Sequence, residues 1–120
     1  MSSLITSNIS DGTTSVPTGY VVNGSAKAWV NINGSGTAAI RESFNCSSLT
    51  DVGVGIYYVT LTNSMFGDAL YSSQVTNTDD GIGRSSSSNT ESIVYMVNRN
   101  TSFSPADTLE IQATIHGDLA

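Results

Sequence analysis

The feature that most constrains the fold is a strict alternation of apolar and polar residues near the end of the chain. The apolar positions are Leu109, Ile111, Ala113 and Ile115, and the polar positions between and after them are Glu110, Gln112, Thr114 and His116. Successive side chains of a β-strand point to opposite faces of a sheet, so this period of two predicts a strand with one buried face. No window of the sequence has apolar residues at helical spacing, and we therefore expect an all-β protein.

Three other stretches give strong strand signals. They are Ala26 to Asn33, Tyr57 to Thr62 and Ser92 to Asn98, which alternate or are densely apolar and are rich in β-branched and aromatic residues. The run Asn33-Gly34-Ser35-Gly36 supplies residues that tolerate positive φ angles, as a tight hairpin turn requires. The first stretch is therefore predicted to form a hairpin with the residues that follow this turn.

The strand after this turn is less regular. Ala38, Ile40 and Phe44 fall on one side of it, and Arg41, Ser43 and Asn45 fall on the other. Glu42 falls on the apolar side and interrupts the pattern. We expect Glu42 to pair with Arg41 or Lys27, or to lie at an interface.

Weaker strand signals at Cys46 to Thr50 and Leu70 to Thr76 bring the total to about seven strands at regular spacing. This pattern predicts an antiparallel β-sandwich of residues 25–120. Residues 1–24 are polar and contain the turn signals Asp11-Gly12 and Pro17, so we expect an extended arm with little core of its own. Such an arm could become ordered against a neighbouring chain.

The charge of the chain argues against two classes of partner. Only 12% of the residues are charged, and four Lys and Arg stand against ten Asp and Glu, for a net charge of -6. Binding to nucleic acid or to an anionic membrane surface needs clustered cations. No apolar run approaches the ~20 residues of a membrane-spanning helix, and the N-terminus lacks the pattern of a signal peptide. We expect neither nucleic-acid binding nor membrane insertion.

The sequence offers few groups for catalysis or for cofactor binding. The one cysteine, Cys46, cannot form a disulfide within the chain and is expected to be a small, half-buried residue. The one histidine, His116, is expected on the polar face of a strand, although three copies around a three-fold axis could hold a metal ion. Asp79-Asp80-Gly81 lacks the spacing of a calcium loop and is expected to form a turn. We expect no bound metal and no cofactor.

Enzymatic activity is not expected. The carboxylates that a glycosidase would need in pairs lie mostly in predicted turns beside Gly or Asn. A chain of 120 residues is also short for building a deep cleft.

Several ordered blocks resemble the C-terminal regions of tail fibre proteins of bacteriophages, in particular podoviruses of the marine and cyanobacterial type. The blocks are Asn8–Thr13, Gly24–Asn31, Asn33–Gly36, Ile40–Asn45, Ser47–Asp51, Gly53, Gly55, Tyr57–Thr62, Met65 and Ile115–Ala120. The resemblance covers most of the chain but is weak from about Ser72 to Asp107. The sequence departs from the family pattern at Cys46, where the family often has Val, and at residues 56–58, where it often has Asp-Tyr-Thr.

The resemblance implies a homotrimeric fibre component on the surface of the virion, in contact with other virion proteins and with the host. We therefore expect a non-enzymatic tail fibre domain that binds a bacterial surface glycan or protein, either as a fragment of a longer fibre or as a short separate virion protein. The alternative is a structural virion protein, such as a capsid decoration protein, a short head fibre or a tail connector. The resemblance implies no particular receptor-binding residues.

The sequence itself suggests where a receptor could bind. Residues 77–91 form the longest polar stretch between two predicted strands, so we expect a surface loop. Its directional donors and acceptors, which are the candidate receptor-binding residues, are Asp79, Asp80, Arg84 and Asn89. The loop Asn63–Ala69 and the turn Asp51–Gly55 are the alternatives. Trp29 lies on the polar side of its strand. It could stack on a sugar ring, but we expect it rather to pack in a subunit interface or against a second sheet layer.

Overall fold

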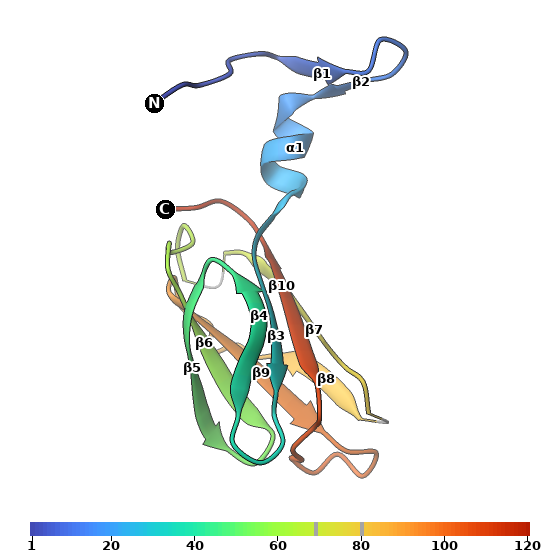
Figure 1. Cartoon of the computed structure of the whole chain (residues 1–120), viewed down its shortest axis with the longest axis vertical. Coiled ribbons are helices and arrows are strands. Elements are labelled where there is room, and N and C mark those ends of the chain that lie inside the picture. The colour runs from blue at the N-terminus through green and yellow to red at the C-terminus, as the bar shows by residue number, and fades with distance from the viewer. Residues whose placement is uncertain (69, 80) are drawn as a thin grey trace.

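The computed structural model describes residues 1–68, 70–79 and 81–120. The strands from β3 onwards form a sandwich of two antiparallel sheets (Figure 1). The first sheet has the strand order β4-β3-β10-β7, with bounds β3 Ala26–Asn33, β4 Ala39–Phe44, β7 Ser72–Asn77 and β10 Ile111–His116. The second sheet has the order β5-β6-β9-β8, with bounds β5 Cys46–Gly53, β6 Ile56–Leu61, β8 Ile82–Ser85 and β9 Ile93–Arg99. The predicted all-β sandwich is confirmed.

The core lies between the two central strands of each sheet. Burial alternates with a period of two along β3, β6, β9 and β10, as the sequence pattern predicts. The buried apolar residues are Ala28, Val30, Ile32, Tyr57, Val59, Leu61, Met65, Val94, Met96, Ile111, Ala113 and Ile115. Each buried Val, Leu, Ile or Met side chain contributes about 1.5–3 kcal/mol, and the alternation fixes which residues face outwards.

A β-bulge in β4 accounts for the irregular position of Glu42. Glu42 pairs with Asn31 and Ile40 pairs with Ile32, which leaves Arg41 as an extra residue in β4. Because the bulge reverses the alternation, Glu42 is exposed and Phe44 is 56% exposed. The prediction that Phe44 shares a face with Ala38 and Ile40 is therefore wrong.

Arg41 forms an ion pair with Glu110 and not with Glu42. Its Nη1 lies 3.2 Å from Oε2 of Glu110, the residue immediately before β10. Lys27 instead donates hydrogen bonds from Nζ to the carbonyl oxygens of Val22 and Ser25. The predicted pairing of Glu42 with Arg41 or Lys27 is not formed.

The predicted loop of residues 77–91 contains a strand, and that prediction is wrong. β8 pairs with β9, with Gly83 opposite Asn98. A Cβ added at Gly83 would lie 3.1 Å from the backbone of Thr76, so glycine permits β8 to approach β7 of the other sheet closely. With a single large apolar residue, Ile82, the strand has almost no hydrophobic pattern to detect.

The N-terminal segment stands beyond one end of the sandwich (Figure 1). It contains the hairpin strands β1 (Asn8–Ser10) and β2 (Ser15–Pro17) and the helix α1 (Thr18–Gly24). None of the seven helical residues is buried. The sequence predicts an extended arm here, and the short helix has no signal in the apolar spacing. We refer to residues 1–24 as the arm.

The hydroxyl group of Tyr57 links the two sheets at the end of the sandwich away from the arm. Tyr57 comes from β6 of the second sheet, and its Oη donates to the carbonyl oxygen of Gly34, 2.6 Å away, in the turn between β3 and β4. Oδ1 of Asp107 lies 3.0 Å from the same Oη and also accepts from the backbone N–H of Gly55 at 2.9 Å. A Cβ at Gly34 would collide with Tyr57 Oη at 2.6 Å, so this turn requires glycine.

Replacing Tyr57 with phenylalanine should therefore destabilise the sandwich. The Y57F variant leaves the buried carbonyl of Gly34 without its donor, at an expected cost of about 1–3 kcal/mol of unfolding free energy. Urea denaturation followed by circular dichroism measures this loss. Y58F is the matched control, because Tyr58 faces outwards, and it should change stability by less than about 0.5 kcal/mol. Equal stability of Y57F and wild type would contradict the structural role of this hydroxyl group.

Candidate binding surfaces

Two of the four residues predicted to contact a receptor are bound to neighbouring parts of the protein. Asp79 Oδ2 accepts hydrogen bonds from Thr108 Oγ1 at 2.5 Å and from the backbone N–H of Leu109 at 3.2 Å. Asn89 is only 8% exposed. Its Nδ2 donates to Ser73 Oγ and Ser85 Oγ, both at 3.0 Å, and its Oδ1 accepts from the backbone N–H of Tyr95 at 2.8 Å.

The four residues therefore do not form one exposed group. Asn89 holds the segment after β8 against β7 and β9, and Asp79 fixes the turn that leads into β10. Arg84 is exposed on β8, and Asp80 lies outside the described residues. Directional polar side chains in a long polar segment can serve its own folding as readily as a ligand, so composition alone does not distinguish the two roles.

The alternative loops expose apolar side chains beside the polar side chains of Asp51, Asn63 and Asp68. In the predicted turn Asp51–Gly55, Val52 near the end of β5 and Val54 just after it are 52% and 60% exposed. In the loop after β6, Phe66 is 62% exposed while Met65 is buried. Ala69, the last residue of this predicted loop, lies outside the described residues.

The outer face of the first sheet carries amide, hydroxyl and aromatic side chains from all four of its strands. Its strand register defines two adjacent rows across the four strands: Phe44, Trp29, Thr114 and Gln74 in one row, and Glu42, Asn31, Gln112 and Thr76 in the other. Trp29 is 37% exposed and lies directly opposite Phe44. We call these eight residues the Trp29 face. The alternating pattern places Trp29 here, but the bulge that brings Phe44 beside it has no signal in the sequence.

A network of hydrogen bonds borders the Trp29 face. Glu110 Oε1 accepts from Asn31 Nδ2 at 2.7 Å and from Gln112 Nε2 at 2.5 Å. Its other oxygen pairs with Arg41, so the carboxylate is neutralised. These contacts fix the amide groups of Asn31 and Gln112. Asn31 Oδ1 is buried and has no hydrogen-bond partner among the described residues.

The outer face of the second sheet is more apolar. Its outward residues on β6 and β9 are Ile56, Tyr58, Thr60, Ile93, Tyr95 and Val97, all half-buried, and β8 adds Ile82 and Arg84. The rings of Tyr58 and Tyr95 are tilted at 44° with centroids 5.3 Å apart, a favourable geometry for an aromatic pair. We call this set the Tyr58 face. The two sides of the sandwich therefore differ in chemistry.

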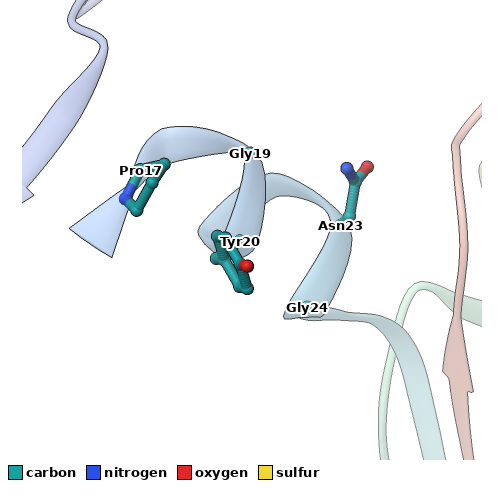
Figure 2. Close-up of a pocket in the computed structure, with 5 residues that line it drawn as sticks. All are labelled: Pro17, Gly19, Tyr20, Asn23 and Gly24. Atoms are coloured by element: carbon teal, nitrogen blue, oxygen red, sulfur yellow. The ribbon is translucent and has the colours of Figure 1, made fainter.

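The arm has hollows of its own. Pro17, Gly19, Tyr20, Asn23 and Gly24 line an open hollow of about 520 Å³ along α1, and Tyr20 is 72% exposed. Figure 2 shows Tyr20 and Asn23 projecting from different sides of the helix, with the sandwich beyond its last turn. A second hollow of about 380 Å³ is lined by Leu4, Ile5, Thr6, Ile9, Thr18, Val21 and Val22.

Three groups whose pKa values are raised lie in the sandwich and serve the fold. Burial raises the pKa of Cys46 to about 11, so this half-buried residue is a thiol at neutral pH and a weak nucleophile. Burial, followed by the nearby Asp68, raises the pKa of Tyr71 to about 12, and its Oη donates to the carbonyl oxygen of Thr90 at 2.8 Å. Burial and then Asp107 raise the pKa of Tyr57 as well. All three groups are neutral at physiological pH.

His116 lies at the end of β10, opposite Ala26 and Ser72, and is half-buried. In residues 1–68, 70–79 and 81–120, no three His, Cys, Asp or Glu side chains come together as a metal site would require. No helix in this part of the chain is long and apolar enough to cross a membrane.

No family model, curated protein or solved structure matches this chain. The surfaces described above must therefore be interpreted from their own chemistry.

Substituting Asn89, which is buried, should destabilise the fold, whereas substituting Arg84, which is exposed, should not. N89A leaves the backbone N–H of Tyr95 without its acceptor and removes the amide that donates to Ser73 and Ser85, whose hydroxyls still bond to each other. It should lower the unfolding free energy by about 1–3 kcal/mol. R84A removes an exposed side chain and should change stability by less than about 0.5 kcal/mol. Thermal melting of both variants measures the difference. Unchanged melting of N89A would show that its hydrogen bonds do not support the fold.

Proposed function

We propose that this chain is a non-enzymatic bacteriophage virion surface protein, the receptor-binding domain of a tail fibre that acts as a homotrimer. The observation that carries the proposal is the arm, whose apolar side chains are uncovered within the single chain. Leu4 and Ile5 are 85% and 94% exposed, and Tyr20 and Val22 are 72% and 59% exposed. The resemblance of Gly24–Asn31 and the neighbouring blocks to tail fibre C-terminal regions supports the assignment to a virion.

The arm cannot hold its structure without further contacts. Isolated helices shorter than about 12–15 residues are marginal in water, and α1 has seven residues with no buried side chain. A two-stranded hairpin such as β1-β2 is also marginal alone. Contacts from another chain would supply the missing burial, and a second and third copy of the same chain are always present where the first is made.

The distribution of charge favours contact through the arm. Each chain carries a net charge of -6, so whole chains repel one another. From Gly12 to Ala26, however, the sequence has no charged residue. Arms can therefore approach one another without bringing like charges together, and their exposed valines and Tyr20 can be buried between copies.

Trimer formation would also suit weak, repeated binding at a host surface. The sandwich offers open faces rather than a deep cleft, and open faces bind with modest affinity per copy. Three sandwiches joined through their arms would bind a repetitive surface with greater avidity than one.

The placement of carboxylates fits a binding protein better than a hydrolase. Asp68 Oδ1 accepts from the backbone N–H of Glu91 at 2.9 Å, and Asp79 is held by Thr108 and Leu109. These acids support turns and are not directed in pairs toward a substrate cleft. Assaying host polysaccharide for released reducing sugar, with none expected, tests this part of the proposal.

Deleting the arm tests assembly and function together. Light scattering should report a trimer for the full chain and a monomer for residues 25–120, because the uncharged apolar contact is lost. The fluorescently labelled full chain should bind host cells, and the truncated chain should bind at least about tenfold more weakly through loss of avidity. Near-wild-type thermal stability of the truncated chain is the control for an intact sandwich.

Two results would contradict the proposal. A truncated chain that remains trimeric with unchanged stability would show that the arm is not the assembly contact. A full chain that assembles but binds no bacterial cell surface would instead favour a structural virion protein, such as a capsid decoration or a connector.

A further inference from the structure

We propose that the Trp29 face binds an uncharged stretch of a polysaccharide chain, with one sugar ring stacked on Trp29. This inference rests on the proposed receptor-binding function and specifies the ligand class and the site. It replaces the candidate residues of the 77–91 segment, of which Asn89 and Asp79 are occupied by contacts within the fold.

The geometry provides a flat surface of the size of a few sugar units. The four strands β4, β3, β10 and β7 lie side by side, and neighbouring strands in a sheet are ~4.8 Å apart. A row across the sheet therefore extends ~14 Å. Trp29 lies in the second strand of its row, between Phe44 and Thr114, so a chain that crosses the strands can contact the aromatic ring and still reach β7.

The side chains match the two chemical parts of a sugar. The carbon–hydrogen face of a pyranose ring is apolar and can lie against an indole ring, which contributes a large flat contact. The hydroxyl groups around the ring donate and accept hydrogen bonds, as do the amides of Gln74 and Gln112 and the hydroxyls of Thr76 and Thr114. A few polar groups beside an aromatic surface are the usual means of orienting a ligand.

The amide groups at the centre of the face are held in place before a ligand arrives. Glu110 accepts from both Asn31 and Gln112, so binding does not have to immobilise two free side chains, and its entropic cost is lower. Asn31 Oδ1 lacks a donor. A hydroxyl group that reached it after a small shift of its neighbours would satisfy this acceptor.

The contrast with the Tyr58 face argues against a subunit contact here. The centres of protein interfaces are enriched in apolar and aromatic groups. Both faces carry two aromatic rings, but only the Tyr58 face surrounds them with isoleucine and valine side chains. Burying the Trp29 face against another protein would instead require partners for its glutamine and threonine side chains, at a cost for each one left unpaired.

Charge restricts the ligand class further. Of the two rows, only Glu42 carries a charge, and the nearby Arg41 and Glu110 neutralise each other. With a net charge of -6 on the chain, a polyanionic glycan would be repelled. We therefore expect a neutral polysaccharide segment, and affinity that changes little between about 0.05 and 0.5 M salt, because few ions are released or screened.

The test measures binding of the trimeric full chain and its W29A variant to intact bacterial strains and to polysaccharides purified from them. W29A should lose at least about tenfold in affinity, as expected for a central aromatic contact, and W29F should retain part of it. F103A is the matched control and should bind like wild type. Phe103 is an aromatic residue on a loop outside the face, and it is 67% exposed. Melting temperature and oligomeric state should be unchanged in all three variants.

Different results would contradict the site, the ligand class and the proposed function. Wild-type affinity of W29A would place the ligand elsewhere while leaving receptor binding intact, and dissociation of the W29A trimer would make the face a subunit contact. Binding to cells that is lost after protease treatment but survives periodate oxidation would make the receptor a protein and overturn the ligand class. If the wild-type chain binds no cell and no polysaccharide, the proposed function fails, and this inference fails with it.

Discussion

The rest of the structure depends on the packing of β3 and β10 of one sheet against β6 and β9 of the other. This contact buries small and branched side chains such as Val30, Val59 and Ile115, and it supplies most of the core of a charge-poor chain. Because side chains alternate along a strand, the same contact also determines what the protein presents to its surroundings. Every residue buried in the core fixes a neighbour on an outer face, and Trp29 faces outwards because Ala28 and Val30 are packed inside.

The central strands could be predicted from the sequence because burial on one face forces a visible period of two. The bounds of β3 agree with those predicted for it. The strands β6, β9 and β10 each begin within two residues of the start predicted for that strand. The bulge at Arg41 and the edge strand β8 could not be predicted in this way. A bulge depends on the register of a partner strand, and β8 is held by backbone pairing with β9 and by the close approach that Gly83 allows. Neither leaves a hydrophobic pattern. The helix α1 has only seven residues, too few to show a helical period of apolar side chains, and none of them is buried.

Composition does not show whether the polar residues of the 77–91 segment bind a ligand or support the fold. Asp79 and Asn89 have the donors and acceptors that a ligand needs, but the same groups satisfy Thr108, Leu109 and Tyr95 in the fold. Only the three-dimensional pairing distinguishes the two uses. The signal for the Trp29 face was partly present, since alternation puts Trp29 outside, whereas its neighbours from β10 and β7 come from distant parts of the sequence. The two outer faces differ in chemistry, one rich in amides and hydroxyls and the other apolar.

Trp29 is the only tryptophan in the chain, so intrinsic tryptophan fluorescence reports on this face alone. The most direct measurement is a fluorescence titration of the wild-type full chain with a polysaccharide that it binds, together with acrylamide quenching. If a sugar ring covers the indole, the emission should shift to shorter wavelength, and quenching by acrylamide should fall as the site fills. Saturable binding with no change in emission or in quenching would show that the ligand lies elsewhere, and would contradict the account.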